Sequence, residues 1–316
     1  MTQPSGHFVP PTRMGVGPSC VGLPVGPWPT MLDFLSERFT AIRRERWQAR
    51  MMAGEVWDEH GATVTAQRPY QQHLRLYYYR DVPVETPIPF EATILFQDEH
   101  LLVVHKPHFL PVAPSGNYLQ QTVLVRLKRE LGIDELSPIH RIDRDTAGLV
   151  LFSLQRSTRG AYQALFRQRQ VHKSYEAIAP WRADLPLPLT RHSRLQEAGH
   201  FMLQHEVDGA PNATTHIALL ETFKHQEQDL ARYRLEPVTG QRHQLRVHMA
   251  ALGLPILGDG LYPTLTPEGQ VDYARPLQLL AKTIAFIDPL SGAPRRFESA
   301  RQLALAPPQE RYQRPD

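Results

Sequence analysis

An aspartate flanked by arginines is the residue of this sequence best suited to chemistry. Asp143 stands between Arg141 and Arg144, in a turn that leads into the apolar run 149–153. Basic neighbours favour the ionised form of a carboxylate, and an ionised, partly desolvated aspartate can act as a nucleophile or as a base. The spacing alone favours a structural ion pair, and Asp145, two residues further on, has a turn position of its own.

Positive charge gathers in two acid-free segments, although the chain as a whole is nearly neutral. The 316 residues include 35 Lys and Arg against 32 Asp and Glu, which leaves a formal charge of +3. Residues 155–175 contain arginines and Lys173 but no acidic residue, and residues 237–258 contain Arg242 and Arg246, again without an acid. Phosphate backbones attract such an arrangement, so the pattern predicts a nucleic-acid surface around Asp143. Each segment taken alone also fits a solvated basic face.

Two further elements present residues toward this region. The strand expected at 171–179 places Lys173 and Tyr175 on one side, where a tyrosine either belongs to the core or stacks on a base. The helix expected to end near Gly253 carries Arg242 and Arg246 on a shared face, since they are four residues apart.

Metal and cofactor sites are not predicted. The single cysteine, Cys20, excludes a disulfide framework and a site built on several thiolates. His243 and His248 are five residues apart, a spacing that does not place both imidazoles on one side of a helix. A Gly-rich phosphate loop following a strand is missing as well, so we expect no nucleotide cofactor.

The elements that must position these residues indicate an α+β fold. In the larger part of the chain the expected strands outnumber helices and many follow each other directly, which predicts a mixed, largely antiparallel sheet. Residues 1–30 form a Pro/Gly-rich arm, 31–85 a small N-terminal domain and 86–316 the main domain. In the small domain, two helices with exposed arginines and a small sheet loosely resemble the RNA-binding domain type named after ribosomal protein S-four. A solvated charged helix on a structural subdomain fits equally well.

The chain is expected to be a cytoplasmic, monomeric protein with no membrane partner. The uncharged run from Met14 to Leu32 is interrupted repeatedly by proline and glycine, which a lipid-exposed helix does not tolerate. The N-terminal residues also lack the basic start and unbroken apolar stretch of a secretory signal.

Four segments together resemble the RluA family of pseudouridine synthases. The segment HRIDRDTAG (140–148) resembles the family's HRLDxxTSG motif, and KSYEA (173–177) resembles its KxYxA motif. The segment 237–262, which reads PVTGQRHQLRVHMAALGLPILGDGLY, is similar to the family's TGRTHQIRVH…HPIxGDxxY segment. LLVVHKP (101–107) and LLAKTIAFIDP (279–289) match flanking segments, so the resemblance covers about 92–300.

This resemblance implies an isomerase that converts a uridine to pseudouridine in ribosomal or transfer RNA without a cofactor. Asp143 would be the catalytic carboxylate, attacking the sugar or removing a ribose proton, and Arg246 would pair with it. Tyr175 would pack against the uracil of a flipped-out nucleoside and serve as a late base, while Arg141 would fill the vacated space. The remaining expected RNA contacts are His140, Arg144, Lys173 and Arg242.

Two other functions fit parts of the pattern. A non-catalytic RNA-binding or folding module could be built on the same scaffold, although the complete set of Asp143, Tyr175 and Arg246 speaks against it. A glycoside hydrolase generally needs two carboxylates about 5–9.5 Å apart, and Asp145, the nearest partner, already has a turn role.

Overall fold

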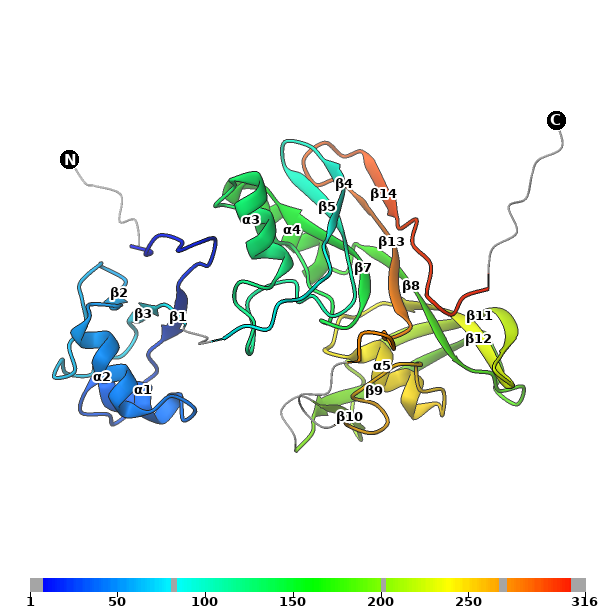
Figure 1. Ribbon diagram of the computed structural model, residues 1–316, viewed down its shortest axis with the longest axis horizontal. Helices are drawn as coiled ribbons and strands as arrows, with labels where there is room; N and C mark the ends of the chain where they lie inside the picture. The colour runs from blue at the N-terminus through cyan, green and yellow to red at the C-terminus, as the bar shows by residue number, and fades with distance from the viewer. Residues whose placement is uncertain (1–7, 81–83, 200–202, 267–271, 308–316) are drawn as a thin grey trace. The chain divides into compact units, whose positions relative to one another are not determined.

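The computed structural model describes residues 8–80, 84–199, 203–266 and 272–307. Its chain forms two compact units (Figure 1). The first comprises Met1–Thr86, Pro114–Gln120 and Val125–Asp134; the second comprises Pro87–Ala113, Gln121–Leu124 and Glu135–Asp316. The first unit therefore includes two segments that lie beyond residue 85, where the sequence pattern placed a boundary.

A small antiparallel sheet and two short helices build the first unit. Its elements are β1 (Ser19–Gly22), α1 (Met31–Arg38), α2 (Arg44–Met52), β2 (Val56–Asp58) and β3 (Arg75–Tyr78), with most of α3 (Val123–Leu131). The strand order is β1–β3–β2. Strand β1 and the buried Leu23 fall inside the segment expected to be an arm, whose residues 1–7 lie outside the described residues.

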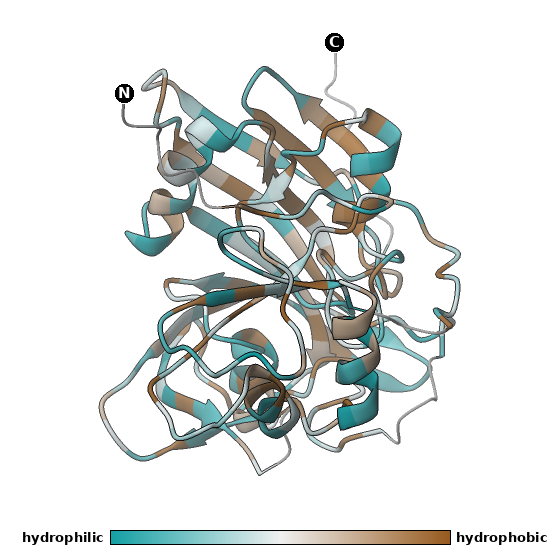
Figure 2. Ribbon diagram, turned by 90° about the vertical axis from the view of Figure 1, so that its left-hand side faces the viewer, coloured by the Kyte–Doolittle hydropathy of each residue, from teal (hydrophilic) through white to brown (hydrophobic). Residues whose placement is uncertain are grey.

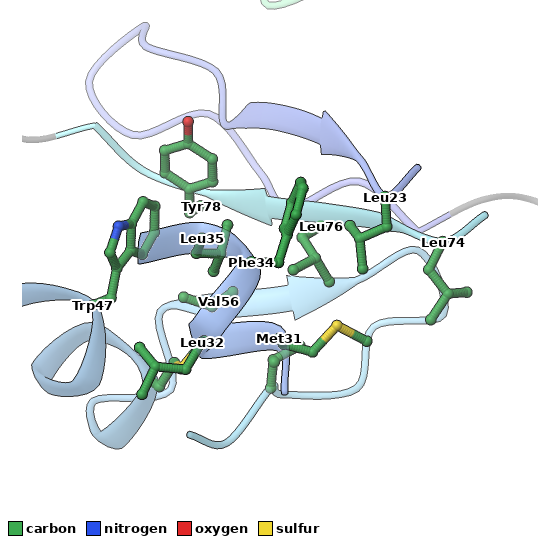
Figure 3. Close-up of a cluster of buried hydrophobic side chains, with 12 residues drawn as sticks. Leu23, Met31, Leu32, Phe34, Leu35, Trp47, Val56, Leu74, Leu76 and Tyr78 are labelled. Carbon is green, nitrogen blue, oxygen red and sulfur yellow. The ribbon is translucent and has the colours of Figure 1, made fainter. Parts of the chain in front are cut away.

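The helices of this unit follow from local sequence signals. Thr30 caps α1, because its hydroxyl accepts the Asp33 amide at 3.2 Å while the Asp33 carboxylate accepts the Thr30 amide at 3.0 Å. The apolar side of α1 packs with Trp47 of α2 and with Leu76 and Tyr78 of β3, as Figure 3 shows. This cluster gives the unit its own core.

The second unit is built on a large mixed sheet. Its strands are β4 (Thr93–Gln97), β5 (Leu101–Lys106), β6 (Ser137–Pro138), β7 (Ala147–Ser153), β8 (His172–Pro180), β9 (Leu189–Glu197), β10 (Gln204–Val207), β11 (Ala213–His225), β12 (Gln228–Pro237), β13 (Leu279–Ile287) and β14 (Pro294–Glu298). The order is β10–β9–β11–β12–β8–β13–β7–β5–β4, with β14 paired to β13 and β6 to β7. Within the described residues every strand pairing is antiparallel except β7 with β13. The predicted fold class is thus confirmed.

Two helices cover parts of this sheet. Helix α4 (Arg156–Arg167) buries Tyr162 and Leu165 against residues of β5, β7 and β13, and α5 (Gln244–Ala251) buries Leu245 and Met249 against β8, β11 and β12. Strands β5 and β7 are buried along their whole lengths, and Figure 2 shows long apolar stretches along the strands of the sheet. Among the described helices, none has the length and apolar character needed to cross a membrane.

A glycine allows β7 and β13 to meet. The parallel contact pairs Ala147 with Leu280 and Gly148 with Ala281. Gly148 has a φ of +119°, and a Cβ there would lie 2.3 Å from the Ala281 carbonyl oxygen. Only glycine fits this close approach. The contact brings the turn before β7, which contains Asp143, to the strands that neighbour β13.

Candidate active site

The turn that carries Asp143 is held by side chains from the end of β5. The backbone carbonyl of Asp143 accepts a hydrogen bond from the Thr146 amide at 3.2 Å, which closes the turn. The Lys106 ammonium donates to the Arg144 carbonyl at 2.8 Å, and His108 Nδ1 donates to the Asp145 carbonyl at 2.7 Å. Backbone oxygens on both residues after Asp143 are therefore anchored, and the turn cannot shift without breaking buried hydrogen bonds.

Lys106 has an unusual environment for a lysine. Its side chain is fully buried, and the Nζ atom also donates to the Pro107 carbonyl at 2.8 Å. Burial lowers the pKa of Lys106 to about 7, although the charges of Asp145 and Asp143 oppose this shift.

Arg246 lies between two carboxylates. It sits on α5 with 1% of its side chain exposed, and its Nη1 lies 3.4 Å from Oδ2 of Asp143. On the other edge, Nε donates to Oδ2 of Asp259 at 2.8 Å and Nη2 bonds to the second oxygen of the same carboxylate. Burial alone lowers the pKa of Arg246, but Asp259 and Asp143 together raise it above the ordinary arginine value.

Asp259 is held in turn by the chain that follows it. Its Oδ1 accepts the amides of Leu261 at 2.8 Å and Tyr262 at 3.1 Å. Only 1% of the Asp259 side chain is exposed, so its position is fixed by these bonds and by Arg246. The loop after α5 therefore orients the guanidinium that reaches Asp143.

Tyr175 lies on β8, within the electrostatic influence of Asp143. Burial raises the pKa of the Tyr175 hydroxyl, and the negative charge of Asp143 raises it further. At neutral pH the Tyr175 hydroxyl therefore keeps its proton. The structure thus brings Asp143, Arg246 and Tyr175, which come from three separate elements, into one cluster.

Lys173 and His140 are already engaged by the protein. Lys173 donates to the Thr239 carbonyl at 3.2 Å, and burial lowers its pKa to about 8. The His140 ring stacks on Phe166 with centroids 4.7 Å apart, and its Nε2 accepts the Leu151 amide at 3.2 Å. Burial, with the charge of Lys173, lowers the pKa of His140 to about 3, so this ring is neutral. Both contacts connect the edge of the site to the sheet.

The three arginines expected to contact RNA differ in their surroundings. Arg141 is exposed and makes no ion pair with other described residues. The Nε atom of Arg144 donates to the Asp145 carboxylate at 2.9 Å, and Arg242 lies 3.9 Å from Glu197 at the surface. Arg141 and Arg242 are thus both exposed, and Arg141 is the one of the three that forms no ion pair within the described residues.

The glycoside hydrolase interpretation requires a carboxylic acid that is protonated near neutral pH. Burial by itself would raise the pKa of Asp145, but Arg144 outweighs it and the pKa lies below the usual range. The surroundings of Asp145 thus favour its ionised form, which is the opposite of what that acid requires. Among the described residues no group of three or more His, Cys, Asp and Glu is arranged to hold a metal ion.

Comparison with known proteins assigns the chain to a family. The family described as RNA pseudouridylate synthase matches residues 100–251. An uncharacterized RNA pseudouridine synthase of Synechocystis is 32% identical over 73% of this chain and 79% of the relative. The dual-specificity RNA pseudouridine synthase RluA of Haemophilus influenzae is 33% identical over 67% of this chain and 94% of the relative. The chain belongs to the RluA family of RNA pseudouridine synthases.

The synthase also shares its fold with a solved structure. The human RNA pseudouridylate synthase domain containing 1 superposes with a TM-score of 0.57 at 20% identity, over 69% of this chain and 86% of that one. A third relative, the ribosomal large subunit pseudouridine synthase D of Xanthomonas campestris, is 32% identical over 66% of this chain and 66% of its own length. RluA-family pseudouridine synthases are isomerases, and the resemblance found in the sequence motifs is confirmed.

Three residues of the cluster in this synthase were not singled out by the sequence pattern. They are Asp259, His243 and Tyr262. Asp259 bonds Arg246, His243 faces Asp143, and Tyr262 bonds His243. Asp259 had a signal: it is the only charged residue of 252–266, and a lone carboxylate in an apolar segment must find a partner. His243 was considered only as a metal ligand.

Proposed function

We propose that this synthase isomerises a specific uridine to pseudouridine in structured RNA, ribosomal or transfer, with Asp143 as its catalytic carboxylate. The observation that carries the proposal is the buried Arg246, which joins Asp143 to the fixed Asp259. Such a partner holds the carboxylate in one orientation, as a nucleophile or a base requires.

The target nucleoside reaches this carboxylate by leaving its stack. Unstacking costs about a few kcal/mol, and binding of the flipped base must offset that cost. Tyr175 supplies an aromatic surface beside Asp143, and the exposed Arg141 is available to occupy the vacated position. Within the described residues neither side chain takes part in an ion pair, so both are available for these roles.

Tyr175 can act as a base only late in the reaction. While Asp143 is ionised, its charge helps to keep the Tyr175 proton in place. Once Asp143 has taken a proton or formed a bond to the sugar, that charge is gone and removal of the tyrosine proton becomes easier, although burial still opposes it. The order Asp143 first and Tyr175 second follows from this coupling.

The RNA class rests on the relatives. One is named a dual-specificity RNA pseudouridine synthase and another a ribosomal large subunit synthase. We therefore infer that ribosomal RNA and transfer RNA are the two candidate substrates. A pseudouridine map of both RNA pools, from source cells with and without the gene, would identify the modified position.

The catalytic role is tested by Asp143→Asn. We expect the purified variant to form no pseudouridine in RNA from cells lacking the gene, while its RNA affinity stays within about threefold, because one neutralised carboxylate removes no phosphate contact. Normal activity in the variant would remove Asp143 from the mechanism. A wild-type protein that binds and refolds RNA without modifying it would instead indicate a non-catalytic module.

A further inference from the structure

His243 is a buried histidine that faces the same carboxylate. Its Nε2 lies 3.9 Å from Oδ1 of Asp143, whereas Arg246 lies 3.4 Å from Oδ2. The two oxygens of Asp143 therefore have different neighbours, one neutral and one charged. The His243 side chain is only 10% exposed, so its ring cannot turn freely toward solvent.

The backbone of His243 is in a conformation that this residue type seldom adopts. Its φ is 55° and its ψ 15°, in the left-handed region, directly before the first residue of α5. Such a conformation persists in a non-glycine residue when the surroundings fix it, and it clusters at functional sites. Here it places the ring between Asp143 and Tyr262.

The Tyr262 hydroxyl is a hydrogen-bond partner of the His243 ring. Its oxygen accepts the Gln204 amide at 2.8 Å and lies 2.9 Å from Nδ1 of His243. When the Tyr262 hydroxyl donates its hydrogen to Nδ1, that nitrogen is unprotonated, and this is the tautomer on which the proposal below is built. Burial lowers the pKa of His243 and favours the neutral ring, whose single hydrogen in this tautomer is on Nε2, the nitrogen that faces Asp143.

We propose that His243 is a positioning residue that holds Oδ1 of Asp143 through its Nε2–H while Arg246 holds Oδ2. This inference rests on the proposed function, in which Asp143 is catalytic. Two donors on two oxygens fix the rotation of the carboxylate about its Cβ–Cγ bond, which one contact alone does not. At 3.9 Å the two atoms are too far apart for a hydrogen bond, so the proposal requires this separation to shorten when RNA binds, as contacts of catalytic groups commonly do.

Two substitutions at His243 separate positioning from a structural role. In His243→Gln the amide nitrogen can take the place of Nε2, whereas in His243→Asn it takes the place of Nδ1 and no donor reaches Asp143. We expect His243→Asn to lower kcat roughly 10- to 100-fold with KM nearly unchanged, and His243→Gln to restore most of that loss. A structural role gives the reverse order, since asparagine tolerates the left-handed backbone better.

Tyr262→Phe provides an independent test that leaves the histidine in place. Loss of the hydroxyl frees the ring to adopt the other tautomer, so kcat should fall roughly tenfold, with little further loss when the change is combined with His243→Asn. If His243→Asn does not fold, Tyr262→Phe decides alone: an unchanged kcat overturns the proposal. His216→Asn is the matched control, because His216 on β11 also bonds a hydroxyl, that of Thr190 at 2.8 Å, but is exposed.

Parallel assays of Asp143→Asn keep the two proposals apart. If that variant is inactive and His243→Asn equals or exceeds His243→Gln in kcat, the positioning role fails and the proposed function stands. If Asp143→Asn is active, the proposed function itself fails. A change in KM alone at His243 would also overturn the inference, since orientation of a catalytic group acts on kcat.

Discussion

Arg246 couples the Asp143 carboxylate to the protein interior. It is buried, and Asp259 neutralises it from the side away from Asp143 through two hydrogen bonds. A buried arginine left without such a partner carries an uncompensated charge, which costs about 3–5 kcal/mol. The pair Arg246–Asp259 therefore contributes to folding and to the geometry of Asp143 at the same time.

Asp259→Asn should reduce both the stability of the fold and the activity, because the Arg246–Asp259 pair contributes to both. We expect the free energy of unfolding to fall by about 3 kcal/mol and kcat to fall roughly 10- to 100-fold, because the guanidinium loses its fixed carboxylate partner. Urea unfolding and single-turnover assays measure the two effects. Asp184→Asn serves as the control, since Asp184 pairs with Arg182 at the exposed surface and should change neither quantity.

Lys106 makes stability depend on pH. Its pKa is about 7 in the folded protein and 10.5 ordinarily, so between these values the unfolded chain binds more protons and stability rises with pH. Urea unfolding at pH 7 and pH 9 should show a gain on the order of 2 kcal/mol from this group, which Lys106→Met should lack. Lys173 contributes equally to the pH dependence of stability in the wild type and in Lys106→Met, so its effect cancels in the difference between them. Parallel pH dependences in the two proteins would contradict the assignment.

The parallel contact of β7 with β13 joins two parts of the sheet at the site. Asp143 precedes β7, whereas Tyr175 lies on β8 and Arg246 on α5, which packs against β8, β11 and β12. The close approach at Gly148 therefore sets the distance between the turn that carries Asp143 and the other residues of the cluster. A change there should affect activity as well as stability.

Gly148→Ala tests this dependence. The added methyl group would meet the Ala281 backbone, and φ is unfavourable for alanine, so we expect a loss of at least about 3 kcal/mol and a kcat reduced with it. Gly160→Ala in α4 is the matched control: its Cβ would meet no atom within 4 Å, and the exchange should stabilise the helix by about 0.5–1 kcal/mol. Equal stabilities of the two variants would refute the argument.

The sequence pattern predicted the apolar elements better than the polar ones. The apolar run 149–153 lies in β7, and the strand expected at 171–179 agrees with β8 within one residue at each end. Strands β9 and β10 were not predicted, because β9 alternates polar with half-buried polar residues and lacks an apolar face. At the site, Asp143 and Arg246 could be identified from their sequence motifs. The bond of Arg246 to Asp259 could not be predicted, because it depends on a loop conformation that no local pattern specifies.

The molecule as a whole combines a catalytic unit with a smaller unit that has its own core. We retain the RNA-binding role of the smaller unit as a proposal, supported by the exposed Arg38 and Arg43 beside α1 and α2. Arg44 is less available, since it pairs with Asp33 at 2.8 Å. Basic residues of this kind displace counterions when they contact phosphates.

Replacing Arg38 and Arg43 by glutamine should therefore reduce the salt dependence of RNA binding. The slope of log K against log salt should fall by about 1.5, since each phosphate contact contributes about 0.7–0.9, while kcat at saturating RNA stays unchanged. Filter binding at several salt concentrations measures the slope. An unchanged slope would leave the smaller unit with a structural role.

The first unit does not end at residue 85. Val16 packs with Leu119 and Val125, Thr12 bonds the Asp134 carboxylate at 2.9 Å, and Arg129 bonds the Met14 carbonyl at 3.1 Å. On the ribosome, β4 and β5 are consequently translated before the chain that completes the first unit has emerged. Nascent-chain folding of the two units must therefore be interleaved, and a ribosome stalled near residue 110 should display a first unit still open to proteases along its N-terminal segment.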